Sequence, residues 1–152
     1  MQSRVERGWR QSDDRALRTV LEFPGGRLVE FDKESPFLRA EMAYESYVMR
    51  HCVGQFADRR ALTGGYGERY AEAVEQGKMR LLSLRDKQGQ PHATISLEVI
   101  SGKPPRVEQV KGKQNRPPVD RYVDAIIHGL NKIGTNLETP EDCLIIGIAR
   151  MD

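Results

Sequence analysis

The sequence predicts an α+β fold: an antiparallel β-meander sheet with an N-terminal hairpin and two to three packed helices. Short β-rich runs recur with glycine- or proline-containing turns between them, as antiparallel strands require. Two amphipathic segments, residues 35–51 and 117–134, carry apolar side chains at helical spacing, and such faces need a sheet to cover. The length of 152 residues suits a single domain with its own core.

The N-terminal part begins with a charged lead-in at residues 1–14, and residues 15–152 form one predicted domain. Residues 17–31 are a predicted hairpin, because two β-rich runs flank a Pro-Gly-Gly turn. A helix should follow, with Ser35 as its cap and Pro36 at its first position. The apolar face of this helix is expected to consist of Phe37, Leu38, Met42, Tyr47 and Val48.

The middle of the chain should contain a second, interrupted helix and then the meander. Residues 55–78 have helical character, but the glycines at 64, 65 and 67 break the segment before it resumes and ends at Gly77. Three strand-like runs follow, at residues 79–85, 92–100 and 106–112. An amphipathic helix over 117–134 should stop at Gly134, and the apolar run at 143–149 predicts a buried strand.

Composition excludes several classes of protein. No apolar run approaches the roughly 18 residues that a membrane span needs, so no membrane association is expected. The charged N-terminus does not resemble a signal peptide, and two distant cysteines do not make a disulfide framework, so a cytoplasmic location is expected. The histidines and cysteines lack the short paired spacings of metal sites, so we expect no metal and no cofactor.

Strand alternation sorts the meander into an apolar and a polar face. Ile95, Leu97 and Val99 should share the core face. If Leu82 and Leu84 join them, the opposite face gathers a set of hydrogen-bond donors, which are Ser83, Arg85, Thr94, Ser96, Gln109 and Lys111. Such a surface suits an anionic ligand, although a solvated sheet face has the same pattern.

A basic segment follows the meander. Between Gly102 and Arg121, basic residues outnumber the two acidic ones, Glu108 and Asp120. In "VKGKQNRPP", Lys111, Lys113, Asn115 and Arg116 stand just before a helix start, which predicts a phosphate cradle. The alternative is a solvated loop in which Asn115 caps the helix.

The pair His51-Cys52 in "VMRHCVGQF" admits three interpretations: a reactive thiol with its base, two metal ligands, or two core residues at a helix end. Adjacent residues on a helix diverge by about 100°, so the two side chains do not face each other. A nucleophilic Cys52 would therefore need His51 in another geometry, or His92 or His128, as its base. A buried, unreactive Cys52 is the simpler alternative.

Three segments in this order resemble the PcfJ-like proteins, a family found largely on conjugative plasmids, integrative elements and phage-related loci. They are "MRHCVGQF", "LLSLRDKQGQPHATISLEV" and "QVKGKQNRPP", within residues 38–130. The matching positions are His51, Cys52, Val53, Gly54, Ser83, Arg85, Thr94, Ile95, Gln109, Gly112, Asn115, Arg116 and Pro117.

The chain departs from the family pattern at two points. The spacer after His-Cys-Val is lengthened by "RRALTGGYGERY". The acidic residue expected directly after Thr-Ile is Ser96 here, with Glu98 two positions on, which leaves the role of that carboxylate open. The resemblance implies a shared fold over residues 15–152 and a shared site, and it supplies no reaction.

The leading hypothesis is a domain that binds or processes a phosphate-bearing ligand, nucleic acid or nucleotide, in a mobile-element or phage-linked system. A second hypothesis is a small effector or toxin enzyme with Cys52 as nucleophile and His51 or His92 as base. A third is a protein-interaction module in which the polar motif only stabilises the fold. The expected ligand contacts are Ser83, Arg85, Thr94, Gln109, Lys111, Lys113, Asn115 and Arg116, with His51 and Cys52 lining the same cleft.

Overall fold

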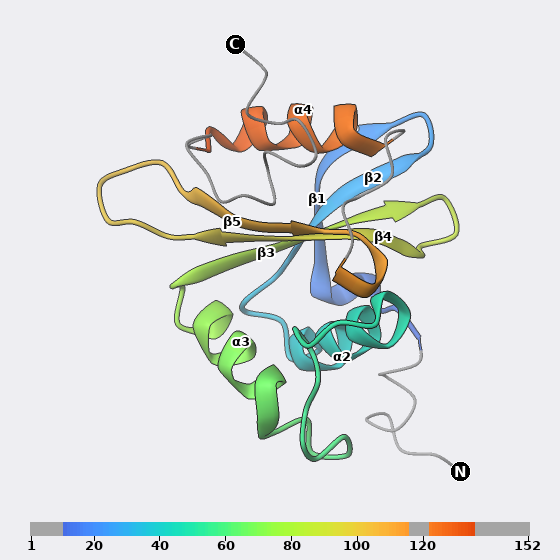
Figure 1. Cartoon of the computed structure of the whole chain (residues 1–152), viewed down its shortest axis with the longest axis vertical. Coiled ribbons are helices and arrows are strands. Elements are labelled where there is room, and N and C mark those ends of the chain that lie inside the picture. The colour runs from blue at the N-terminus through green and yellow to red at the C-terminus, as the bar shows by residue number, and fades with distance from the viewer. Residues whose placement is uncertain (1–10, 116–121, 136–152) are drawn as a thin grey trace.

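Five strands form one antiparallel sheet in the order β1-β2-β3-β4-β5, so each strand pairs with its neighbour in sequence (Figure 1). The computed structural model that gives this arrangement describes residues 11–115 and 122–135. The strands are β1 (Leu17–Phe23), β2 (Gly26–Phe31), β3 (Met79–Asp86), β4 (Pro91–Glu98) and β5 (Arg106–Lys111). The α-helices are α2 (Leu38–Met49), α3 (Gly65–Glu75) and α4 (Val123–Ile133), with short 3₁₀ turns η1 (Asp14–Ala16) and η2 (Lys113–Asn115). The predicted α+β meander is confirmed.

The N-terminal hairpin belongs to the same sheet as the meander. β1 pairs with β2, and β2 continues the sheet by pairing with β3. Gly26 opens β2 opposite Asp86, and a Cβ at this position would lie 2.0 Å from the carbonyl oxygen of Arg85. Glycine is therefore needed at this point because of the close approach of the β3 backbone.

The sheet lies between two layers of helix, α4 on one face and α2 with α3 on the other (Figure 1). Each face has an apolar core of its own, as expected for a sheet covered on both sides. The α4 face buries Leu28, Leu82, Leu84, Ala93, Ile95, Leu97, Val107, Val110, Tyr122, Ala125, Ile126, Ile127 and Leu130. The other face buries Phe31, Leu38, Met42, Ala43, Val53, Phe56, Leu62, Ala71, Val74 and Leu81. The polar face of the meander is thus covered over β3 and β4, where Ser83, Arg85, Thr94 and Ser96 are buried, and it is open to solvent only at β5, where Gln109 is exposed.

Helix α2 begins later than predicted and buries a different face. Its first residue is Leu38, and Ser35 instead closes the preceding turn, where its hydroxyl accepts the Phe37 N–H at 3.1 Å. Tyr47 was expected on the apolar face, but 54% of its surface is exposed. Two glutamates share the buried face of this helix, Glu41 and Glu45.

Helix α3 is tied to α2 by a charged clamp. The guanidinium of Arg39 on α2 binds Glu68 (2.8 Å) and Glu75 (2.9 Å) on α3. It also donates to the carbonyl oxygen of Leu62 in the loop between the helices. These pairs outweigh the desolvation of Arg39, so they raise the pKa of its guanidinium. The clamp fixes the loop that carries His51 and Cys52.

The predicted C-terminal helix is confirmed over Val123–Ile133, where Gly134 ends it with a left-handed φ of 82°. The predicted strand at 143–149 and the helix start at 117–121 lie outside the described residues. Within the described ranges, no helix combines the length and the apolar character needed to cross a bilayer.

Candidate functional site

A group of charged and polar side chains is buried between α2 and the sheet. Arg85 on β3 has no exposed surface, and its guanidinium binds Glu41 at 2.9 Å and Glu45 at 2.7 Å. Both carboxylates are also fully buried, and they point the same way because they lie four residues apart on the helix. The Nε of Arg85 donates to the Ser83 hydroxyl (2.8 Å), which donates in turn to Glu45 (2.9 Å). We call these four residues the buried ion cluster.

Residues of the lead-in complete this cluster. The Ser12 hydroxyl and the Asp13 backbone N–H donate to the two oxygens of Glu41, at 2.7 and 2.6 Å. A buried carboxylate needs such donors, because desolvation strongly disfavours an unpaired charge. The fold therefore includes residues before position 15.

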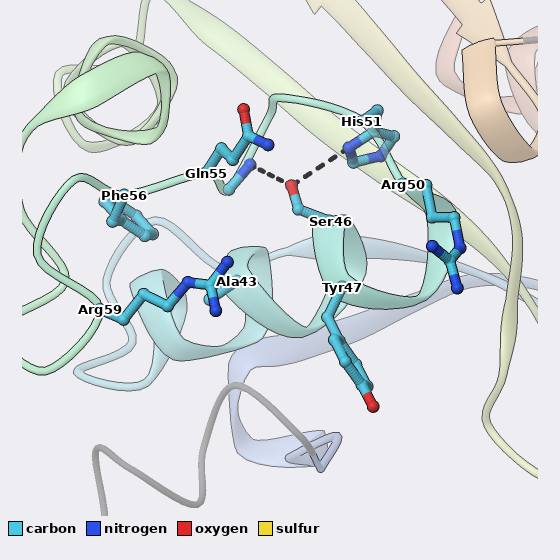
Figure 2. A pocket seen from close by; sticks show the side chains of 9 residues that line it. Ala43, Ser46, Tyr47, Arg50, His51, Gln55, Phe56 and Arg59 are labelled. Atoms are coloured by element: carbon cyan, nitrogen blue, oxygen red, sulfur yellow. Dashed lines mark hydrogen bonds between the residues drawn. The ribbon is translucent and has the colours of Figure 1, made fainter.

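A chain of hydrogen bonds runs from the cluster to the turn after α2. Thr94 on β4 donates its only hydroxyl proton to Glu45, so Thr94 Oγ1 must accept from His51 Nε2, at 2.9 Å. The Nδ1 atom of His51 is then unprotonated and accepts from the Ser46 hydroxyl at 3.1 Å. Ser46 Oγ in turn accepts the Gly54 backbone N–H (Figure 2). This network assigns His51 as the neutral Nε2–H tautomer.

The electrostatics agree with that assignment. Burial lowers the pKa of His51, although the charge of Glu45 acts in the opposite direction. Burial raises the pKa of Glu41 against the effect of Arg85. Burial alone would lower the pKa of Arg85, but Glu45 and Glu41 outweigh it and raise that pKa. At neutral pH, an uncharged His51 and a charged Arg85 are therefore linked through Thr94 and Glu45.

Local backbone geometry explains why His51 reaches this position. Arg50 ends α2 in the left-handed conformation, with φ 58° and ψ 54°, and so turns the chain back toward the sheet. Gly54 then packs directly on the helix, since a Cβ there would lie 1.9 Å from the carbonyl oxygen of Met42. Only glycine fits here, because any side chain would collide with the helix backbone.

The turn and the β4–β5 edge enclose a cleft of about 310 Å³, which we call the β5 cleft. Register pairs Thr94 with Lys111 and Ser96 with Gln109, so these four side chains lie on one face of the sheet. None of the lining residues that the structure describes is a carboxylate. Its lining residues are His51, Cys52, Val53, Tyr70, Leu81, Thr94, Ser96, Gln109 and Lys111.

Ser96 stands out within the β5 cleft. Only 4% of its surface is exposed, yet its hydroxyl has no hydrogen-bond partner among residues 11–115 and 122–135. Buried hydroxyls are nearly always paired with protein, water or a ligand. The Ser96 hydroxyl is therefore available to form a hydrogen bond with water or a ligand inside the cleft.

A model of one protein family, described as PcfJ-like protein, matches residues 39–127. The chain belongs to the PcfJ-like family. No curated protein matches the chain, and neither does any solved structure.

The three parts of the PcfJ-like pattern meet around His51. The first part supplies His51 and Cys52 to the β5 cleft, the strand part supplies Thr94, and the third part supplies Gln109. Ser83 and Arg85, the other half of the strand part, do not reach the cleft. Both are fully buried and paired with α2, which corrects the expectation that they contact a ligand directly. They hold Glu45, which orients Thr94 and, through it, His51.

The basic end of the PcfJ-like pattern is only partly described. Lys111 lines the cleft, and Lys113 is exposed at the start of η2, which packs beside α2. Arg116, Pro117 and the side chain of Asn115 lie outside the described part of the chain. Whether Asn115 caps a helix or binds a ligand therefore stays a prediction.

The two departures from the PcfJ-like pattern have structural counterparts. The lengthened spacer forms the α2–α3 loop and the first turns of α3, and it brings Tyr70 to the β5 cleft. Ser96 occupies the position of the expected acid and lines the same cleft. Glu98 is bound to Arg106 across the strand pair and does not line the cleft.

The geometry does not assemble a cysteine nucleophile with a histidine base. Both ring nitrogens of His51 are engaged, by Ser46 and Thr94, and the Cys52 thiol contacts the Tyr70 hydroxyl at 3.9 Å. Tyr70 is no base near neutral pH, because burial and its neighbour Cys52 raise its pKa to about 12. His92 binds Asp86 at 2.8 Å and packs against Tyr122 of the α4 core, so it does not serve Cys52. His128 lies on α4, across the sheet from Cys52.

A second cavity of about 310 Å³ lies on the other side of His51, and we call it the Arg50 pocket (Figure 2). Its described lining residues again include no carboxylate, and they are Ala43, Ser46, Tyr47, Arg50, His51, Gly54, Gln55, Phe56 and Arg59. This pocket was not predicted, because Tyr47 was assigned to the core. The available signal was the pair of arginines, Arg50 and Arg59, that flank "HCVGQF".

Proposed function

We propose that this PcfJ-like domain binds a phosphate-bearing ligand, a nucleotide or a nucleotide unit of a nucleic acid, in the β5 cleft. The observation that carries the proposal is the buried hydroxyl of Ser96, which has no hydrogen-bond partner in the described part of the chain. It faces a cleft whose described lining includes a lysine and an amide but no carboxylate. A set of donors without acceptors of negative charge suits a phosphate oxygen better than a cation or an apolar molecule.

Different residues of the β5 cleft would supply charge, hydrogen bonds and apolar contact to the ligand. Lys111 supplies the positive charge, and Ser96 with Gln109 supplies directional hydrogen bonds from neighbouring strands. Val53, Leu81 and the Tyr70 ring give an apolar wall against which a sugar or base can pack. His51 Nε2–H and the Thr94 hydroxyl already donate hydrogen bonds within the protein, so these residues shape the cleft rather than donate to the ligand.

The biological setting of the proposal comes from the family. PcfJ-like proteins occur largely on conjugative plasmids, integrative elements and phage-related loci, where nucleic acid is transferred and processed. Binding of a nucleotide or a strand by this domain, in such a mobile-element or phage-linked system, is consistent with that setting. The proposal assigns the domain no reaction.

Binding assays with two cleft variants test the proposal. Titration calorimetry would measure binding of nucleoside triphosphates, nucleoside monophosphates and short oligonucleotides by the full chain. Lys111→Ala should weaken binding at least tenfold, since hydrogen bonds to charged groups contribute about 1.5–3 kcal/mol. Ser96→Ala should weaken binding less, by about fivefold, since it removes one neutral donor.

The matched control is Lys103→Ala, which removes the same charge from an exposed position in the β4–β5 turn, at the other end of β5. A Lys111→Ala variant that binds as well as the Lys103→Ala variant would overturn the proposal. So would the absence of binding by every phosphate-bearing probe at millimolar concentration.

A further inference from the structure

The two cavities beside His51 together define the class of ligand. We infer that the phosphate-bearing ligand is a single-stranded nucleic acid, with one nucleotide in the β5 cleft and a neighbouring nucleotide at the Arg50 pocket. This inference rests on the proposed function and adds to it the length and strandedness of the ligand.

The two cavities share one wall. His51 lines both cavities, and its neighbours in sequence divide between them: Arg50 lines one and Cys52 lines the other. A ligand passing between the cavities therefore crosses only this three-residue turn. Each cavity is about 310 Å³, the lower end of the range for small-molecule sites, which suits one nucleotide per cavity.

The Arg50 pocket combines basic and aromatic side chains. Arg50 and Arg59 bring two positive charges to the pocket from the loop after α2, and none of its described lining residues is a carboxylate. Tyr47 projects from α2 between these arginines in the view of Figure 2 and is 54% exposed. An exposed aromatic ring between cations is the usual arrangement for stacking a base while holding its phosphates.

The backbone of Arg50 has an uncommon conformation. A non-glycine residue with φ 58° is uncommon and is retained where the surroundings require it. Here the left-handed turn places the exposed Arg50 at the pocket while His51 enters the buried hydrogen-bond chain. The same turn thus sets the charge of one cavity and the wall of both.

These features favour single strands over duplex. A base can enter a cavity or stack on a tyrosine only if it is unpaired, since in a duplex its faces are covered by its neighbours. A mononucleotide would occupy the β5 cleft and leave the Arg50 pocket without effect on its binding. Affinity should therefore rise with strand length.

Fluorescence anisotropy with the full chain tests the inference. The probes are single-stranded oligothymidylates of increasing length, a duplex of equal length, and thymidine monophosphate as competitor. Octanucleotide should bind at least tenfold more tightly than the monophosphate and more tightly than the duplex. Arg50→Asn, which tolerates the left-handed backbone, should weaken octanucleotide binding about tenfold and reduce the salt slope by about 0.7. Tyr47→Ala should weaken it by at least fivefold.

Neither variant should change binding of the monophosphate. Arg69→Asn is the matched control, because Arg69 is an exposed arginine on α3 that lines neither cavity. Equal affinity for monophosphate and octanucleotide would overturn the inference, as would equal losses in the Arg50→Asn and Arg69→Asn variants. If the monophosphate binds and Lys111→Ala abolishes that binding, the proposed function stands even when the length dependence fails. If no probe binds, both are wrong.

Discussion

Thr94 is the link between the buried ion cluster and His51, and replacing it with valine tests the whole hydrogen-bond chain. Valine has nearly the same shape and is equally suited to a strand, so Thr94→Val removes the hydroxyl and little else. That hydroxyl donates to Glu45 and accepts from His51 Nε2 at 2.9 Å. All three side chains are buried, so the lost bonds are not freely replaced by bonds to bulk water.

The magnitude follows from the groups left without partners. Removal of the hydroxyl leaves one carboxylate oxygen and one ring N–H unpaired, at about 1–3 kcal/mol each. Burial of a methyl group in place of the hydroxyl offsets about 1 kcal/mol. We therefore expect Thr94→Val to lower the free energy of unfolding by about 1–5 kcal/mol. Thr94→Ser keeps the hydroxyl and loses one methyl group, so it should cost only about 1 kcal/mol.

Urea denaturation of the two variants, followed by circular dichroism, measures this difference. Long-range ¹H–¹⁵N spectra of the imidazole provide an independent readout, because the chain of donors requires the Nε2–H tautomer of His51 in the unmodified protein. If Thr94→Val is as stable as Thr94→Ser, or if His51 carries its proton on Nδ1, the assigned network is wrong.

Three further predictions concern the same region. Because burial lowers the pKa of His51, the unfolded chain binds a proton below about pH 6.5 that the folded chain does not bind. The free energy of unfolding should therefore fall on acidification, by up to about 1.4 kcal/mol per pH unit relative to a His51→Gln variant. Urea titrations between pH 7 and about pH 5.5 would measure this fall. Arg85→Met should destabilise by about 3–5 kcal/mol in the same assay, since two buried carboxylates lose their cation, whereas equal stability would mean that they are protonated. Gly54→Ala should lower the thermal midpoint far more than Gly25→Ala. A Cβ at position 54 would lie 1.9 Å from the carbonyl oxygen of Met42, whereas the nearest atom to a Cβ at position 25 is 3.5 Å away. Similar midpoints for the two variants would contradict this packing.

The sequence was sufficient to predict the meander and most of its faces. Period-two alternation placed Ile95 and Leu97 on the core side and Thr94 with Ser96 on the other, and the structure agrees. Val99 was expected in the core as well, but it follows the last residue of β4 and is 41% exposed. The pattern left the faces of Leu82 and Leu84 open, and the structure places both in the core. The hairpin was predictable because its turn residues admit few other structures. These features depend on local pattern, which a single sequence carries.

The buried ion cluster was not predicted, because charged residues four apart on a helix normally mark a solvated face. Glu41 and Glu45 fall on the same stripe as Leu38, Met42 and Met49, all of which are buried. This position within the apolar stripe was the signal, and the presence of Arg85 on the facing strand explains it. Partners 40 or more residues apart in sequence cannot be paired by periodicity.

The position of Tyr47 was wrong for a related reason. An aromatic residue on an amphipathic helix was assigned to the core, whereas Ala43, Tyr44 and Ser46 are buried instead and Tyr47 lines the Arg50 pocket. The buried stripe of α2 includes polar residues, so its direction differs from that of the purely apolar residues. Once the stripe is known to include Glu41 and Glu45, the exposed side of the helix follows.

The residues of the PcfJ-like pattern therefore act in two different ways, which changes how mutations should be interpreted. Ser83 and Arg85 have no exposed surface, and they affect a ligand only through Glu45 and the orientation of Thr94. Loss of binding in an Arg85 variant would thus reflect a disturbed fold and is no evidence of contact. Gln109 and Lys111 lie at the sheet edge and line the β5 cleft, so their replacement should alter binding at nearly unchanged stability. Measurement of both quantities for each variant separates the two groups, and a Lys111 variant that unfolds would place it with Arg85.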